Sequence, residues 1–98
     1  MFKSAHLTPQ IPAEARVRKG IDLLDRKIPG WRIQIDFDAL DIGWSSKCVM
    51  GQLFGDFGDG IRELGLADIG GYEFGFASYG GREGFRDLTD KWKELAPV

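Results

Sequence analysis

The chain has 98 residues, a length that suits one domain and is too short for two separate hydrophobic cores. With 43% hydrophobic residues, 29% charged residues and a net charge of −2, the composition is globular and excludes disorder driven by charge repulsion. No apolar run approaches the ~20 residues of a membrane span, and the single cysteine, Cys48, excludes an internal disulfide framework and a cysteine-based zinc site, so we expect a cytoplasmic protein without membrane insertion.

The N-terminal third predicts an arm followed by a long helix. Residues 1–10 show no hydrophobic period, so we expect a flexible arm before a single globular domain over 11–98. A helix over about 12–28 is predicted by apolar residues at steps of four, three and four: Val17, Ile21, Leu24 and Ile28. Pro12 suits the first turn, where no N–H is needed. Gly20 costs a helix ~1 kcal/mol against alanine, which indicates a close helix crossing.

Two segments alternate in the manner of β-strands. Over residues 32–38, Ile33, Ile35 and Phe37 alternate with polar side chains, which indicates a half-buried strand. Over residues 72–78, three aromatic residues alternate with smaller or charged ones, and we expect this segment to pair with the first. Because two strands alone are marginally stable, the pair would need helices packed on it.

The middle of the chain predicts two short helices. Apolar residues recur on one helical face, but four glycines interrupt the run: the face consists of Met50, Leu53, Phe57, Ile61 and Leu64. We therefore predict a break, with helices at about 46–55 and 58–64. Ser45 or Ser46 is expected to cap the first helix, and Gly65 to end the second in the left-handed conformation.

A closing helix is predicted over about 86–96, with Trp92 on its apolar face. The expected fold class is α+β: a mostly helical small single domain of three to four helices with a short two-stranded element. The expected core contains Val17, Ile21, Leu24, Leu53, Phe57, Ile61, Leu88 and Trp92.

A cluster of aspartates has the spacing of a possible cation site. Asp36, Asp38 and Asp41 could offer oxygen ligands to calcium or magnesium. In a calcium-binding loop that starts at Asp36, the fifth, sixth and twelfth positions need an oxygen ligand, a glycine and a glutamate. They are Leu40, Asp41 and Lys47, so the pattern fails. We interpret the aspartates as solvated or turn-capping residues and expect no metal.

Cys48 lies near a predicted helix start, where the helix dipole can lower a thiol pKa. A nucleophile also needs a base, and the one histidine, His6, lies in the expected arm. We therefore interpret Cys48 as a buried structural cysteine. No Gly-rich phosphate loop is present. We expect no catalytic residues, no cofactor and no enzymatic activity.

Two groups of residues are candidates for contact with a partner. Arg16, Lys19 and Arg26 share the polar face of the first predicted helix and could contact phosphates, although the isoelectric point near 5.3 argues against strong nucleic-acid affinity. Four aromatic residues in predicted turns or in the aromatic segment are further candidates, since exposed aromatics are enriched at interfaces; core packing is the commoner role for them. These four are Trp31, Trp44, Tyr72 and Tyr79.

Three segments resemble a known group of proteins. They are W-R-I-Q-I-D-F-D-A-L-D over 31–41, C-V-M-G-Q-L-F-G over 48–55, and the stretch 85–95 with its L-T-D-K-W-K. Together they are similar to small proteins of unknown function encoded by actinobacteriophages and some actinobacterial genomes, over about Arg16 to Leu95. The resemblance implies a phage accessory protein in the host cytoplasm, and it carries over no catalytic residues.

These observations favour a phage-encoded accessory protein that binds and modulates a host protein without catalysis. Small size, surplus aromatic residues and an uneven charge, +3 over residues 11–32 and −5 over residues 33–68, motivate this hypothesis. One alternative is a nucleic-acid-associated regulator that uses the basic face of the first helix. A minor virion component is another, and self-association into a homo-oligomer stays open.

Overall fold

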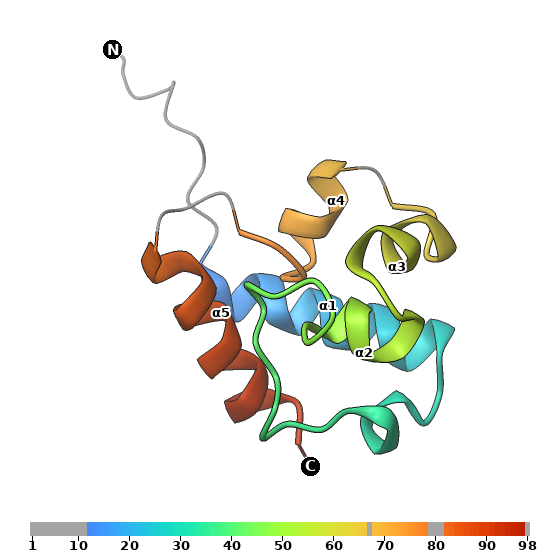
Figure 1. Ribbon diagram of the computed structural model, residues 1–98, viewed down its shortest axis with the longest axis horizontal. Coiled ribbons are helices and arrows are strands. Elements are labelled where there is room, and N and C mark those ends of the chain that lie inside the picture. Colours follow the sequence, from blue (N-terminus) through green and yellow to red (C-terminus); the bar gives the residue numbers. More distant parts are fainter. Residues whose placement is uncertain (1–11, 67, 79–81, 98) are drawn as a thin grey trace.

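The computed structural model describes residues 12–66, 68–78 and 82–97, and this part of the chain is helical (Figure 1). The elements are α1 (Ala13–Lys27), the 3-10 helix η1 (Trp31–Gln34), α2 (Val49–Phe54), α3 (Phe57–Glu63), α4 (Asp68–Glu73) and α5 (Arg82–Leu95). No strand occurs among the described residues, so the predicted α+β fold with a two-stranded element is wrong. The expected arm over 1–10 lies outside them.

Helix α1 runs through the middle of the molecule and packs against α5 and α4, while α3 joins α4 to α2, and α2 contacts η1 (Figure 1). The three intervening helices have six or seven residues each, too few for stability alone, so packing on their neighbours must hold them. The connection from η1 to α2 is tied to α5, because Ile42 N–H donates to Thr89 Oγ1 at 2.9 Å. No helix in the described ranges is both long and apolar enough to cross a bilayer.

The first predicted strand, 32–38, is replaced by η1 and a turn. Asp36 Oδ1 accepts hydrogen bonds from the backbone N–H groups two and three residues further on, at 3.0 and 3.3 Å. Such a bond offers the backbone an alternative to strand pairing. The alternating pattern placed Ile33 and Ile35 on the same side of a strand. In the structure their environments differ, since Ile33 is 90% exposed and Ile35 is buried.

The second predicted strand, 72–78, begins as the end of α4 and continues as its C-terminal turn. Gly75 has φ +76°, in the left-handed region that glycine adopts without strain. The N–H groups of Phe76 and Ala77 both donate to Gly71 O, at 2.8 and 3.1 Å, which closes the turn. The glycine that appeared to alternate with aromatic residues therefore ends a helix.

The other helices follow the sequence more closely. The predicted break between α2 and α3 is confirmed, with Gly55 at φ +97° and Asp56 capping α3 through Gly58 N–H at 2.8 Å. Gly65 has the expected left-handed conformation. The cap of α2 is Cys48, whose Sγ accepts from Gly51 N–H at 3.3 Å; the prediction of a serine cap is wrong.

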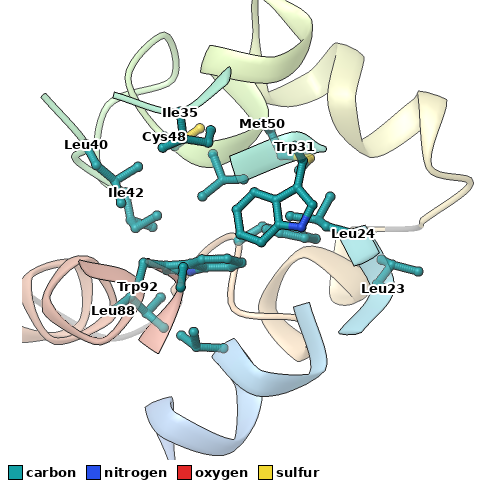
Figure 2. Close-up of a cluster of buried hydrophobic side chains, with 14 of the residues drawn as sticks. Leu23, Leu24, Trp31, Ile35, Leu40, Ile42, Cys48, Met50, Leu88 and Trp92 are labelled. Carbon is teal, nitrogen blue, oxygen red and sulfur yellow. The ribbon is translucent and has the colours of Figure 1, made fainter. Parts of the chain in front are cut away.

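Trp92 lies at the centre of the core, with no exposed surface (Figure 2). Its ring stacks on Phe76 with centroids 5.6 Å apart and meets the perpendicular ring of Trp31 at 6.0 Å. Its indole N–H donates to Gly75 O at 2.7 Å. Of the predicted core, five residues are buried (Val17, Leu24, Ile61, Leu88 and Trp92) and three are partly buried against them (Ile21, Leu53 and Phe57).

The close crossing expected at Gly20 is confirmed and generates a prediction. A Cβ atom there would overlap the carbonyl oxygen of Phe74 and lie 3.0 Å from the Trp92 ring. Although alanine favours helix formation, we expect Gly20→Ala to lower the free energy of unfolding by ~1–3 kcal/mol, the usual cost of overpacking. Urea unfolding followed by circular dichroism measures it.

Gly58→Ala is the matched control. A Cβ at Gly58 in α3 would meet no backbone atom and only the ends of two exposed side chains, Asp56 Oδ2 at 3.2 Å and Arg62 Nη1 at 3.7 Å. We expect this variant to be neutral or stabilised by up to ~1 kcal/mol. Equal effects of the two substitutions would contradict the close crossing.

A second prediction concerns Asp25, at the end of α1. Its Oδ1 accepts hydrogen bonds from Trp31 Nε1 at 2.9 Å and from Arg32 Nη1 at 2.7 Å. Both bonds lower the pKa of the carboxyl group, and the bond from Trp31 has the larger effect. Because the folded pKa lies below the unfolded value of about 3.9, the carboxylate stabilises the fold at neutral pH, and this contribution is lost as pH falls through the folded pKa.

Asp25→Asn should therefore be less stable than the parent chain at neutral pH. The difference should shrink between about pH 5 and about pH 3, as the parent carboxylate is protonated. Urea midpoints of both chains across this range test it. A difference that stays constant on acidification would show that charge is not the cause.

Candidate functional site

Arg16, predicted on a solvated basic face, is buried, with 6% of its surface exposed. Its Nε donates to Tyr72 O and its Nη2 to Ala77 O, both at 2.9 Å, and its guanidinium lies 3.9 Å from the centroid of the Tyr72 ring. Burial lowers the pKa of Arg16, with the charge of Tyr72 acting in the opposite direction. Arg16 and Tyr72 are thus brought together, but as a clamp that joins α1 to the end of α4.

The exposed cations of α1 are largely paired with carboxylates. Lys19 bonds to Glu73 of α4 at 2.7 Å. Two further pairs form within the helix: Arg18 with Glu14 at 3.0 Å, and Arg26 with Asp22 at 3.2 Å. Among the lysine and arginine side chains that the structure describes on α1, only that of Lys27 is neither buried nor part of an ion pair. The helix therefore presents little uncompensated positive charge.

The aromatic candidates divide by exposure. Trp31 is fully buried in the core, so it offers no surface to a partner, contrary to its place among the predicted binding residues. Tyr72 is partly buried in the clamp, and Tyr79 lies outside the described residues. Trp44 is 55% exposed, as expected of one of the two tryptophans in predicted turns.

An apolar pocket of about 220 Å³ is lined in part by Gly43 and Ser45, the two neighbours of Trp44 in the sequence. Three segments distant in sequence form its walls: the loop before α2, the turn after α4 and the first turns of α5, with one residue from α3. The lining residues are Ile42, Gly43, Ser45, Cys48, Phe57, Phe76, Ala77, Ser78 and Phe85. We call this the apolar pocket. Phe85, which is 36% exposed, closes one side against Gly43.

The loop that carries Trp44 is held by its own backbone. Asp41 N–H donates to Lys47 O at 3.3 Å, and Asp41 Oδ1 accepts from Gly43 N–H at 2.9 Å. The carbonyl oxygen of Trp44 accepts from the N–H groups of Lys47 and Cys48, at 3.0 and 2.9 Å. The backbone of Trp44 is thus fixed, while its side chain is left exposed with the Lys47 ammonium 4.7 Å from the centroid of its ring.

Cys48 forms part of the pocket wall and is 1% exposed. Its Sγ accepts from Gly51 N–H and lies 3.6 Å from Ser45 O. Burial raises the pKa of the thiol, backbone hydrogen bonds oppose that rise, and the nearby charge of Asp56 adds to it. The expected burial of Cys48 is confirmed, and these surroundings disfavour the thiolate.

The aspartates act on their own backbone. Asp36 and Asp41 each close a turn through a side-chain oxygen. Within the described ranges no group of three metal-ligating side chains gathers. A polar hollow of about 380 Å³ adjoins the apolar pocket at Phe85 and is lined by two acids and two bases: Asp41, Asp90, Arg86 and Lys93.

Sequence reasoning missed the pocket, although it singled out Trp44. The spacing of apolar residues places Phe85 on the face of a helix, and the alternation places Phe76 on the face of a strand. Neither pattern shows that both side chains line the apolar pocket. The available signal was local: a tryptophan, Trp44, in a predicted turn between the small residues Gly43 and Ser45.

The environment of Cys48 generates a prediction. A raised pKa leaves less thiolate at a given pH, and burial blocks approach of a reagent. At about pH 8 we therefore expect a disulfide reagent to modify the folded chain at least ~10-fold more slowly than the chain in urea. Absorbance of the released thiol measures both rates. Equal rates would contradict a buried thiol.

Comparisons with known protein families, curated proteins and solved structures find no match to this chain. What the surface around Trp44 does is therefore inferred from its own side chains.

Proposed function

We propose that this chain is a non-catalytic binding protein that engages another protein through the apolar pocket and Trp44. In the setting that the actinobacteriophage resemblance implies, it is a phage accessory protein that modulates a host protein in the host cytoplasm. The observation that carries the proposal is an exposed tryptophan, Trp44, whose two neighbours in the sequence line a preformed apolar pocket.

The exposure of Trp44 supports a protein partner. A large aromatic side chain that is 55% exposed leaves apolar area in water, and contact with a partner would remove it. Tryptophan is enriched among the residues that dominate interface energetics. Phe85, which lines the pocket and is 36% exposed, adds further apolar surface.

The size of the pocket supports a side-chain occupant. Its volume of about 220 Å³ lies below the ~300–1,000 Å³ that is usual for small-molecule sites. A pocket of this size suits one large side chain. Its lining is mainly apolar, so the matching side chain is apolar too.

The nucleic-acid alternative has less support. Phosphate binding relies on lysine and arginine side chains free to neutralise the backbone. Three of the cations on α1 are engaged by carboxylates, and Arg16 is buried. A virion component would use the same apolar surface for assembly, so mass spectrometry of purified particles separates that alternative from a host partner.

The test uses two substitutions of exposed apolar residues. Trp44→Ser removes the proposed anchor. Ile33→Ser removes a side chain that is 90% exposed and belongs to η1, an element that supplies no residue to the pocket. Both chains should unfold within ~0.5 kcal/mol of the parent, as expected for surface positions. In affinity capture from actinobacterial lysates, the parent and Ile33→Ser should retain one stoichiometric partner.

Trp44→Ser should lower the affinity for that partner by about 30-fold, the effect of losing an interface hot spot. Surface plasmon resonance with the purified partner measures it. A partner that binds Trp44→Ser as tightly as the parent, or no partner across several host lysates, would refute the proposal.

A further inference from the structure

We infer that the apolar pocket receives a basic segment of the partner protein: one large apolar side chain enters the pocket, and neighbouring lysine or arginine side chains meet Asp41 and Asp56. The inference rests on the proposed function and adds the chemistry of the partner. It comes from where the negative charge of this chain is left uncompensated.

That charge is concentrated in the segment that supplies most of the pocket wall. Between residues 33 and 66, the described carboxylates outnumber the cations six to two. One pair, Arg62 with Asp59, cancels. The carboxylates are Asp36, Asp38, Asp41, Asp56, Asp59 and Glu63, and the cations are Lys47 and Arg62. Helix α1 differs, because most of its charges are matched in pairs.

Asp41 and Asp56 are the two carboxylates of this segment that border the pocket. Asp41 bonds to the N–H of the lining residue Gly43. Asp56 precedes the lining residue Phe57, and its charge acts on the thiol of Cys48 in the pocket wall.

Both carboxylates are held in place by a backbone hydrogen bond and are not part of an ion pair within the described residues. Each accepts a backbone N–H through one oxygen, at 2.9 Å for Asp41 and 2.8 Å for Asp56. Neither has an ion-pair partner in the described part of the chain. The second oxygen of each carboxylate can therefore accept a charge-assisted hydrogen bond from a partner without a rearrangement of the loop.

The opposite wall is electrically balanced. From Gly84 onward α5 is neutral without Asp41, because it carries three cations and three carboxylates: Arg86, Lys91, Lys93, Asp87, Asp90 and Glu94. Asp41 lines the adjoining polar hollow with Arg86 and Lys93, but it forms an ion pair with neither of them. Lys47 lies over the ring of Trp44. The surroundings of the pocket are therefore net acidic on the side of the segment 41–57 and neutral on the side of α5, which favours a cationic partner for both encounter and orientation.

A second copy of this chain fits less well. In a two-fold dimer the same patch lies on both sides of the interface, so the acidic wall would be brought near its own copy. Like charges brought together at an interface oppose association. Self-association is therefore an outcome that the experiment must detect.

The probe is a library of random short peptides displayed on their own mRNA, selected against the immobilised full chain, with Trp44→Ser as the counter-target. We expect the retained peptides to combine a large apolar residue with flanking lysine or arginine. Retained peptides that are neutral or acidic would overturn the inference, and so would the absence of any peptide that discriminates between the parent and Trp44→Ser.

The carboxylates are tested directly with the tightest retained peptide. The double substitution Asp41→Asn and Asp56→Asn removes both charges and keeps a side-chain oxygen for the backbone N–H. We expect it to weaken binding about tenfold in low salt, and added salt to reduce that difference. Asp38→Asn, which removes one carboxylate from the same segment but not from the pocket edge, should change affinity less than about twofold. Equal effects of the two charge removals would overturn the inference.

Failure of the inference and failure of the proposed function give different results. A lysate partner that needs Trp44 but binds the double asparagine variant as tightly as the parent leaves the function intact and refutes the basic segment. No Trp44-dependent partner refutes the function itself. A parent chain that dimerises in light-scattering measurements, and loses the dimer on Trp44→Ser, assigns the pocket to a second copy and overturns the inference.

Discussion

The contact on which the rest of the structure depends is the burial of the Trp92 indole against three segments at once. Its ring stacks on Phe76 and meets Trp31 edge-on, and its N–H satisfies the carbonyl of Gly75. Gly20 lets α1 approach the same ring, because a side chain there would collide with it. Short elements such as η1 and α4 are not stable alone, so this shared contact fixes η1 and the turn that ends α4 against α1 and α5.

The apolar pocket is continuous with this core. Phe76 is stacked on Trp92 and also lines the pocket, so its position is set by the core packing. Ala77, the next lining residue, is held by Arg16, which donates to its carbonyl oxygen. The buried arginine thus supports the proposed binding surface from behind and takes no part in its charge. A pocket held in this way is formed before a partner arrives, which reduces the entropy cost of binding.

Charge and shape divide the surface into two regions. On α1 most of the exposed charges are satisfied by neighbours one turn away or on α4, so that this helix has little net attraction for either sign. The segment before and within α2 and α3 keeps unpaired carboxylates beside an exposed tryptophan. The proposed function and the inferred basic partner both follow from this contrast, since unmatched charge next to apolar surface is what a partner can complement.

The sequence by itself determined the elements that depend on local chemistry. The period of the apolar residues located α1 and α5, and the glycines and Asp56 located the break between α2 and α3. The burial of Trp92 also followed from pattern. Only the tertiary structure decided what depends on contacts between distant segments. Alternation predicted strands at 32–38 and 72–78, but a strand needs a pairing partner. In these two segments backbone N–H groups instead form local hydrogen bonds, to Asp36 Oδ1 and to Gly71 O. Periodicity likewise could not show that α1's cations would find carboxylates, or that three segments would meet around one pocket, because one-dimensional spacing carries no information about which faces come together.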